Sequence, residues 1–247
     1  NLLTGRVRYY GDDIAAVVAE DEVTAARALK LIKVEYEEYP VEIDPRKSMY
    51  GTPHPVHLDK KDNVLARSNF FIGNVEQGLK DSDTVIKRSY KTPIVQHCHI
   101  ENPISYAYME KGRIVVVTST QIPHIVRRVI GQALGIPWGK VRVIKPYIGG
   151  GLNAFLTTLV GGRPVKLDVT REETFCNTRT RHSIEYDLTA GVDKDGHLIA
   201  KDMLAISNQG AYASHGHAIA ANGLTAWRLQ YSCPNIKGEA YTVYTNC

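Results

Sequence analysis

The stretch that decides the fold runs from Ser119 to Gly151 and reads STQIPHIVRRVIGQALGIPWGKVRVIKPYIGGG. It follows Arg113–Thr118, a β-branched run that predicts a strand. Between Pro123 and Gly135 apolar residues recur at helical spacing, and a proline and a glycine are typical of a helix start and end. A second β-branched run, Val141–Ile144, then leads into the three glycines. The order strand, turn, helix, strand and glycine turn predicts an α/β fold.

The two turns in this stretch are suited to a ligand. Gln121 stands at the start of the predicted helix, where its amide offers a donor and an acceptor beside outward-pointing backbone N–H groups. Gly149, Gly150 and Gly151 lack Cβ atoms, so the backbone there can approach a large ligand closely. The residues alone leave two plainer interpretations open, an amide satisfied by neighbouring backbone and a tight turn after a strand. As a pair, the turns suit a polar, anionic cofactor.

Further motifs occur in a fixed order along the chain. They are Gly73–Gly78, Gln96–Glu101, Ser119–His124, Gly149–Gly151, Gly210–Ser214 and Pro234–Gly238 with Tyr244–Asn246. In this order they resemble the molybdenum hydroxylases, the family of xanthine dehydrogenase and aldehyde oxidase. The resemblance extends over essentially the whole chain and implies a molybdenum–molybdopterin cofactor, either plain or as a dinucleotide.

The composition is that of a soluble globular protein, since 43% of its 247 residues are hydrophobic and 23% are charged. The net charge is +4, but lysines and arginines are scattered among acids, which argues against nucleic-acid binding. No apolar run approaches the ~20 residues of a membrane span. The four cysteines are widely spaced and form no Cys-x-x-Cys pair, which argues against a disulfide scaffold and against iron–sulfur ligation in this chain. We therefore expect a cytoplasmic setting.

Residues 1–62 are predicted to form a small α/β domain. Ile14–Val18 and Val34–Val41 have the composition of strands, and Asp21 is a candidate N-cap for the helix between them. The resemblance identifies this unit with the hammerhead domain, incomplete at its N-terminus. Residues from about Asp44 to Asn74 lack sustained periodicity, so a linker is predicted up to about residue 72.

Residues 73–247 are predicted to be the N-terminal part of a mixed α/β molybdopterin-binding domain, so the fold class is α/β (α+β). A helix over 152–160, a strand over 164–169 and a hairpin over 183–207 are expected after the glycines. The hairpin turns at Asp193–Gly196, because Asp-Gly between β-type residues is a strong turn signal.

The resemblance assigns roles to the two turns. It implies that Gln121 lies beside the metal centre and hydrogen-bonds an oxygen ligand, and that the glycine turn brings backbone N–H groups there. The family continues its glycines with Phe-Gly and roughly ten further residues, whereas Gly151 here is followed directly by Leu152. This junction is either a genuine deletion or a place where the molecule carries about ten more residues, and we expect the second.

For the substrate, the resemblance points to the position twelve residues before Pro234, where xanthine dehydrogenases have an arginine that orients a purine. Asn222 occupies it here, and asparagine cannot stabilise negative charge on a ring as arginine does. Xanthine is therefore in doubt, while another purine, nicotinate or an aldehyde stays open. The family's catalytic Glu-Gly-x-Gly motif is absent and the chain ends at Cys247, so no catalytic residue is assigned.

Histidines elsewhere in the chain are candidate metal ligands. His97 and His99, with Glu101, share one face if this segment is a strand, but no fourth ligand is nearby in the sequence. His215 and His217 repeat the spacing and suit a polar loop. His124 is best explained as a helix-start residue. No direct metal ligand is predicted.

The function expected from the sequence is that of a molybdopterin-binding part of a molybdenum hydroxylase, acting on an N-heterocycle or an aldehyde with water-derived oxygen. [2Fe–2S] clusters and FAD are expected on partner chains or domains, and the isolated chain is expected to be inactive. The alternative is a non-catalytic assembly or binding subunit with the same fold. A nucleotide-binding domain is disfavoured, because no Gly-x-Gly-x-x-Gly occurs at a strand–helix junction.

Overall fold

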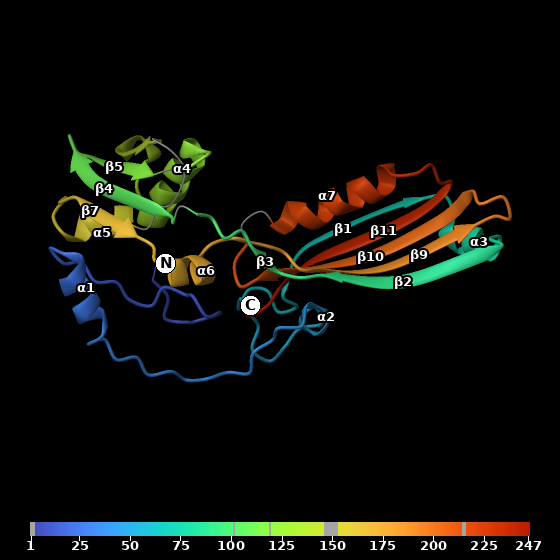
Figure 1. The fold of residues 1–247 in the computed structure, drawn as a ribbon, viewed down its shortest axis with the longest axis horizontal. Helices are drawn as coiled ribbons and strands as arrows, with labels where there is room; N and C mark the ends of the chain where they lie inside the picture. The colour runs from blue at the N-terminus through green and yellow to red at the C-terminus, as the bar shows by residue number, and fades with distance from the viewer. Residues whose placement is uncertain (1–2, 101, 119, 146–152, 214–215) are drawn as a thin grey trace. The chain divides into compact units, whose positions relative to one another are not determined.

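The structure is a computed structural model that describes residues 3–100, 102–118, 120–145, 153–213 and 216–247. The chain divides into two compact units, and each unit combines two separate segments. Unit 1 contains Asn1–Tyr36 and Cys98–Arg179, and unit 2 contains Glu37–His97 and Thr180–Cys247. Both units combine a mixed sheet with helices, which confirms the predicted α/β class (Figure 1).

Unit 1 has a four-stranded sheet in the order β6-β5-β4-β7. Its strands are β4 (Ile104–Glu110), β5 (Arg113–Thr118), β6 (Val141–Ile144) and β7 (Val165–Asp168). β5 and β6 are parallel and are joined through α4 (Pro123–Leu134), while β4 pairs antiparallel with both β5 and β7. The predicted order of strand, helix and strand is therefore confirmed.

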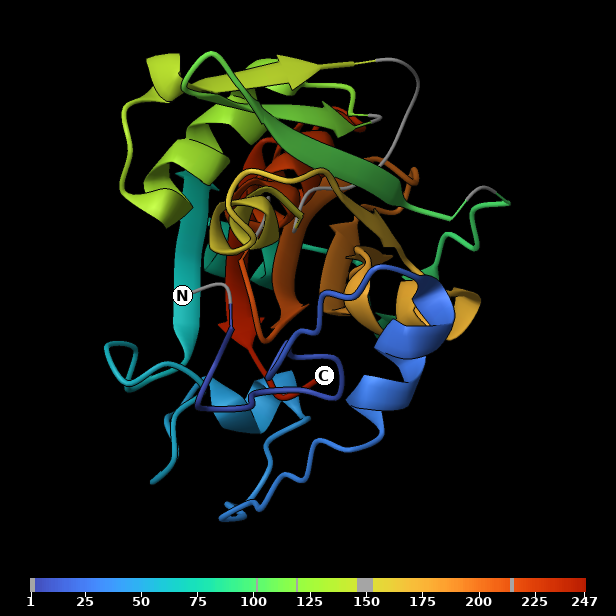
Figure 2. The same cartoon turned by 90° about the vertical axis from the view of Figure 1, so that its left-hand side faces the viewer.

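Helix α4 forms where its sequence signals place it. Pro123 occupies its first turn, and Gly135 ends it in the left-handed conformation at φ 65°, which glycine adopts without a steric penalty. A short 3₁₀ helix, Trp138–Lys140, then leads into β6. Helix α5 (Asn153–Leu159) covers the same face of the sheet as α4 (Figure 2). The core between them contains Ala107, Ile114, Val116, Ile130, Val141 and Ala154.

The remaining helices of unit 1 are α1 (Glu22–Leu29) and α6 (Arg171–Asn177). Asp21 caps α1 as predicted, and Thr170 with Glu173 forms a capping box at α6. The strands predicted over 14–18 and 34–41 are wrong. Both segments are irregular, because neither pairs with another strand within the described residues, and strand composition without a partner does not make a sheet.

Unit 2 has a five-stranded sheet in the order β1-β11-β10-β9-β2. The strands are β1 (Val64–Ile72), β2 (Thr84–Thr92), β9 (Ile184–Val192), β10 (Leu198–Gly210) and β11 (Asn235–Tyr244). β10 and β11 are parallel, and the other neighbours are antiparallel. A separate two-stranded pair joins β3 (Val95–Gln96) to β8 (Thr180–Arg181).

Helix α7 (Gly216–Leu229) connects β10 to β11 and packs along one face of this sheet (Figure 1). Its Ala220 and Leu224 bury against Met203 and Ala205 of β10. Two short helices, α2 (Pro45–Ser48) and α3 (Val75–Lys80), also pack on this sheet. α2 lines a cavity together with Leu204 and Ile206 of β10. These two residues alternate along the strand with Met203 and Ala205, which pack against α7, so α2 lies on the face of the sheet opposite α7.

Part of the predicted linker between Asp44 and Asn74 is structured. Residues 64–72 form β1, which pairs with β11 over eight positions. The linker prediction is wrong here because polar residues such as Arg67 and Asn69 mask the strand pattern, and the pairing partner lies far along the chain. The domain boundary predicted near residue 62 stays a prediction.

The β9–β10 hairpin confirms the Asp-Gly turn. Asp193 accepts backbone hydrogen bonds from Asp195 and His197 at 2.9 Å and 2.8 Å, and Gly196 adopts φ 84°. None of the described helices is long and apolar enough to span a bilayer.

Candidate functional site

The first candidate site lies at one edge of the unit 1 sheet. β5 and β6 are parallel, so their carboxyl ends meet at the same edge, where Gln121 follows β5 and Lys145 follows β6. Ser105 pairs with Thr118, which brings the start of β4, preceded by Asn102, to this edge as well. Ligands of α/β sheets bind at the carboxyl ends of parallel strands. The topology therefore gathers three polar side chains at the place where a ligand is expected.

The start of α4 leaves one backbone donor available at this edge. Its N-cap is Ile122, which makes no side-chain capping bond, and Pro123 has no N–H group. The N–H groups of Ile125 and Val126 bond the carbonyl of Ile122, so the His124 N–H is the one for which no partner is found among the described residues. The Gln121 side chain is exposed, and no hydrogen bond to it is found among the described residues. An exposed amide beside an uncapped helix start provides neutral donors together with the positive end of the helix dipole.

Asn102 supplies an orphaned acceptor nearby. Its Oδ1 atom is buried and has no hydrogen-bond partner within the part of the chain that the structure describes. A buried polar atom without a partner costs stability unless a ligand or water satisfies it. The Gln121 amide, the His124 N–H and this acceptor therefore fit a polar group with both kinds of hydrogen-bonding atom, such as a pterin.

The predicted glycine turn, Gly149, Gly150 and Gly151, lies outside the described residues, as does the junction with Leu152. The strand that leads to it is described, and β6 ends at Ile144 on the same edge as Gln121. The roles of the three glycines stay predictions.

Asn222 lies on α7 in unit 2, two residues after buried Ala220 and two before buried Leu224. Its side chain is therefore on the exposed side of the helix. Gln121 belongs to unit 1, so Gln121 and Asn222 lie in different units. The assignment of Asn222 to a substrate pocket stays a prediction.

A second polar cluster, at the carboxyl ends of β10 and β11, was not predicted. Gln209 is 8% exposed, and its Oε1 atom is buried without a partner among the described residues. The polar run Ser207-Asn208-Gln209, directly after the apolar residues Met203–Ile206, was the signal available in the sequence. The buried polar members of the cluster are Asn63, Ser207, Asn208, Gln209, Thr242 and Thr245.

The histidine predictions have mixed outcomes. β3 ends at Gln96, so His97 and His99 do not share a strand face, and that expectation is wrong. Glu101 and His215 lie outside the described residues. His182 packs beside this cluster, with Nδ1 3.0 Å from the hydroxyl of Ser207, and burial lowers the pKa of His182 from its ordinary value of 6.5.

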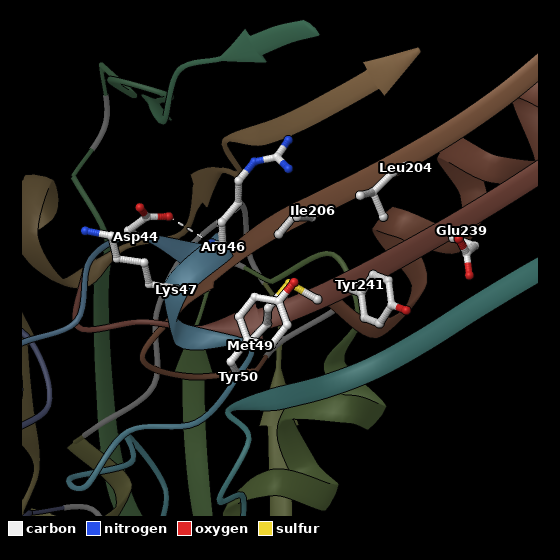
Figure 3. Close-up of a pocket in the computed structure, with 9 residues that line it drawn as sticks. All are labelled: Asp44, Arg46, Lys47, Met49, Tyr50, Leu204, Ile206, Glu239 and Tyr241. Carbon is white, nitrogen blue, oxygen red and sulfur yellow. Dashed lines mark hydrogen bonds between the residues drawn. The ribbon is translucent and has the colours of Figure 1, made fainter. Parts of the chain in front are cut away.

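A cavity of about 540 Å³ lies on the face of the unit 2 sheet opposite α7 (Figure 3). Leu204 and Ile206 form an apolar floor, and Tyr50 and Tyr241 lie at its side. The other lining residues are Asp44, Arg46, Lys47, Met49 and Glu239. Arg46 is bound to Glu185 at 2.6 Å and to Asp187 at 2.8 Å, so its charge is already neutralised by the sheet.

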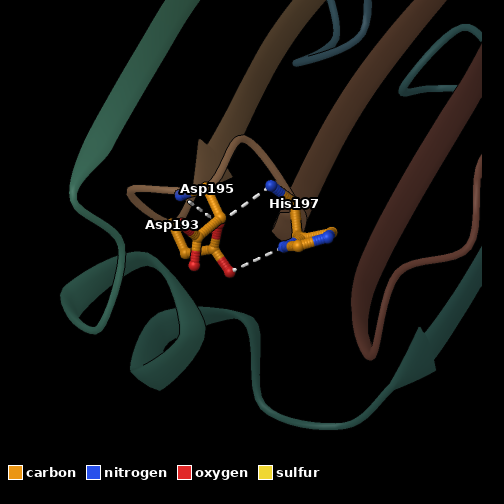
Figure 4. A group of neighbouring side chains, drawn as sticks. All are labelled: Asp193, Asp195 and His197. Atoms are coloured by element: carbon orange, nitrogen blue, oxygen red, sulfur yellow. Dashed lines mark hydrogen bonds and ion pairs between the residues drawn. The ribbon is translucent and has the colours of Figure 1, made fainter.

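Asp193, Asp195 and His197 bring three oxygen or nitrogen ligand atoms within 4.8 Å of one another at the hairpin tip (Figure 4). Asp193 already accepts hydrogen bonds from both other residues, and His197 and Asp195 are exposed. The group is explained by the turn that it stabilises.

Comparison with known families decides the identity. The family model described as "Molybdopterin cofactor-binding domain" matches residues 56–247. The chain belongs to this family. A second model, "Aldehyde oxidase and xanthine dehydrogenase, a/b hammerhead domain", matches residues 1–40 of this molybdopterin cofactor-binding protein. The predicted resemblance to the molybdenum hydroxylases is confirmed.

Proteins that are similar to this molybdopterin cofactor-binding protein support the same family. The xanthine dehydrogenase molybdenum-binding subunit of Escherichia coli O157:H7 is 45% identical over 99% of the chain, which spans 34% of that relative. The nicotinate dehydrogenase large molybdopterin subunit of Eubacterium barkeri is 31% identical over 99% of the chain and 60% of its own length. Quinoline 2-oxidoreductase from Pseudomonas putida 86 has a similar structure, with a TM-score of 0.90 and 25% sequence identity. The match covers 99% of this chain and 33% of the length of that structure's chain. The chain thus spans about a third of the length of the first and third of these relatives.

Proposed function

We propose that this chain forms part of a molybdenum-dependent oxidoreductase and holds the molybdopterin cofactor at the carboxyl edge of β5 and β6. One observation supports this most directly: the exposed Gln121 amide and the uncapped start of α4 stand beside the end of β6, which leads to the glycine run. Asn102 adds an acceptor that has no partner among the described residues at the same edge. The family membership of residues 56–247 supports the same cofactor.

When bound, the molybdenum centre supplies two-electron oxidation of a carbon centre with oxygen from water. The residues of this chain bind and orient the group. The Gln121 amide donates a hydrogen bond without adding charge, and the dipole of α4 favours negative charge at its start. No proton-transferring residue is assigned within these 247 residues.

The proposed substrate is an N-heterocycle or an aldehyde, and Asn222 is the proposed contact to an aromatic ring. The exposed position of Asn222 on α7 supports this, since its amide is available to a ligand. We expect Asn222→Ala to raise KM for heterocycles. Unchanged KM for every heterocycle that is turned over would refute the assignment.

The proposed setting is the cytoplasm. We propose [2Fe–2S] and FAD partners because both relatives are subunits by name. We also propose residues 1–62 and 73–247 as the two domains of the sequence. The alternative, a non-catalytic assembly subunit, is kept because no catalytic glutamate motif is present in these 247 residues.

The junction after Gly151 is proposed to carry additional residues in the molecule. The match to the Escherichia coli subunit extends over 257 residues, ten more than the 247 of this chain, so that relative has at least ten positions without a counterpart here. At 27.5 kDa for 247 residues, ten more would add about 1.1 kDa to the intact mass. An intact mass of 27.5 kDa would show a genuine deletion.

The decisive experiment is metal and pterin analysis of the native assembly purified from cells supplied with molybdate. The proposal expects one molybdenum and one pterin for each subunit, and Gln121→Leu is expected to lower turnover more than cofactor content. Absence of both molybdenum and pterin would refute it and favour the assembly subunit. Turnover by the isolated 247 residues would refute the expected need for partners.

A further inference from the structure

The segment 42–63, here called the clasp, folds across the carboxyl ends of β10 and β11. Ser48 donates its hydroxyl to the carbonyl of Tyr244 at 2.8 Å, and the Tyr244 N–H donates to the carbonyl of Asn63 at 2.7 Å. The Asn63 amide in turn donates to the Ser48 hydroxyl at 3.1 Å. Ser48 and Asn63 are fully buried. The clasp is therefore an ordered part of unit 2, and the C-terminus lies beside α2 within it (Figure 2).

The clasp reaches one further backbone atom, in the turn that follows β10. His57 Nε2 lies 2.7 Å from the carbonyl oxygen of Ala211. From the other side, Gln209 Nε2 donates to the carbonyl of Tyr212 at 2.8 Å. Two consecutive carbonyls of one turn are thus held by two side chains from different elements.

The contact of His57 has a definite chemical form. A carbonyl oxygen accepts but does not donate, so Nε2 must carry a proton. The imidazole is half-buried and packs against two aromatic rings, with its centroid 4.6 Å from that of Tyr244 and 5.8 Å from that of Tyr212. This packing restricts the ring, so His57 fixes the position of Ala211 as well as pairing its carbonyl.

The turn has little freedom to move elsewhere. Gly210 adopts φ 71°, and a Cβ there would lie 2.9 Å from the carbonyl oxygen of Cys247. Ala211 is 3% exposed, whereas the Tyr212 side chain next to it is 44% exposed. The turn leads to α7, which carries Asn222. A buried, braced backbone therefore presents an exposed side chain at the carboxyl edge of a parallel strand pair, where ligands bind.

We propose that His57 is a positioning residue, which holds the Ala211–Tyr212 turn in place for the heterocyclic substrate. This rests on the proposed function. It assigns a role in substrate binding to His57 and to no other residue of the clasp. His57 acts through the backbone carbonyl of Ala211, and no contact between His57 and the reacting atoms is assigned.

The test uses the full-length subunit with its partners and cofactor, and compares two substitutions at one position. His57→Leu removes the donor. His57→Gln places an amide N–H near the position of Nε2 and keeps a donor. The matched control is His54→Leu, because His54 lies in the same clasp, is exposed and stacks on Tyr39 with centroids 4.8 Å apart. A second control, Ser48→Ala, weakens the clasp without touching the turn.

Two readouts are measured, steady-state kinetics with a heterocycle and deuterium uptake of the peptide that spans the turn. His57→Leu is expected to raise KM about fivefold, the factor for losing one hydrogen bond of ordinary strength, with kcat within about twofold. Uptake of the turn peptide should increase. His57→Gln should restore both, and His54→Leu and Ser48→Ala should leave KM unchanged.

Either of two results would overturn the proposal: unchanged KM in His57→Leu, or an equal KM rise in Ser48→Ala, which would indicate general loosening of the clasp. Failure of His57→Gln to restore KM would also count against it. If the wild-type assembly holds no molybdenum, the proposed function fails by itself, and deuterium uptake alone decides whether His57 holds the turn.

Discussion

Lys201 is almost completely buried in unit 2, at 2% exposure, and it is the residue whose replacement we expect to reveal most about stability. Its ammonium group donates to the carbonyls of Trp227, at 2.7 Å, and of Gln230, at the C-terminal end of α7. It also lies 5.1 Å from the centroid of the Trp227 ring. A single buried cation therefore caps the helix end that would otherwise expose unpaired carbonyls.

The size of the effect of Lys201→Met follows from these contacts. Hydrogen bonds to a charged group contribute about 1.5–3 kcal/mol each, and a cation at a helix C-terminus adds about 0.3–1 kcal/mol. Against this, burial takes the Lys201 ammonium out of water and lowers its pKa, a desolvation cost that methionine does not have. We expect a net loss of about 2 kcal/mol.

The assay is thermal and urea unfolding of the purified protein at neutral pH. A loss of about 2 kcal/mol corresponds to a fall in Tm of roughly 4–8 °C for a chain of this size. Lys194→Met is the matched control, because Lys194 is exposed in the hairpin turn and should change stability by less than about 0.5 kcal/mol. Equal or higher stability of Lys201→Met would refute the reasoning, since the desolvation cost would then exceed the gain from the contacts.

Two further predictions concern the neighbourhood of α7. Gly216→Ala should destabilise the protein by about 1–3 kcal/mol, because the added Cβ would lie 1.2 Å from the Gln209 Oε1 atom. Gly223→Ala should stabilise it by up to about 1 kcal/mol, because a Cβ at Gly223 meets nothing within 4 Å. Equal urea midpoints for the two variants would contradict this prediction. Burial lowers the pKa of His182, so below about pH 6.5 the unfolded chain binds a proton more readily than the folded protein does. The free energy of unfolding is therefore highest above that pH and falls as the pH drops below it. His182→Gln should therefore lose less stability than the wild type between about pH 7.5 and about pH 5.5 in urea titrations, and parallel losses would count against a buried, neutral imidazole.

The parts of the fold that the sequence predicts are those whose signals are local. β5, α4 and β6 follow from a β-branched run, a helical period and two residues that suit helix ends. The β9–β10 hairpin follows from Asp-Gly at its turn, because the partner strand is adjacent in the sequence. In each case a few consecutive residues contain the physical cause of the element.

The parts that were missed depend on partners far away in the chain. β1 looks irregular by itself and becomes a strand because β11 pairs with it. Residues 14–18 look like a strand and remain irregular, since no partner is found within the described residues. For the candidate site, Gln121 was predicted from its place before α4, but Asn102 reaches the same edge through the pairing of β4 with β5, which periodicity does not reveal.

The order of strands in unit 2 has a consequence for synthesis on the ribosome. Its two edge strands, β1 and β2, are made first, and the three central strands are made last. About 100 residues are synthesised between the end of β2 at Thr92 and the end of its pairing partner β9 at Val192. At about 5–20 residues per second this interval is roughly 5–20 s, during which two strands have no sheet to join. The nascent chain therefore displays unpaired strand edges that invite chaperones or aggregation until β9, β10 and β11 emerge and close the sheet from the inside.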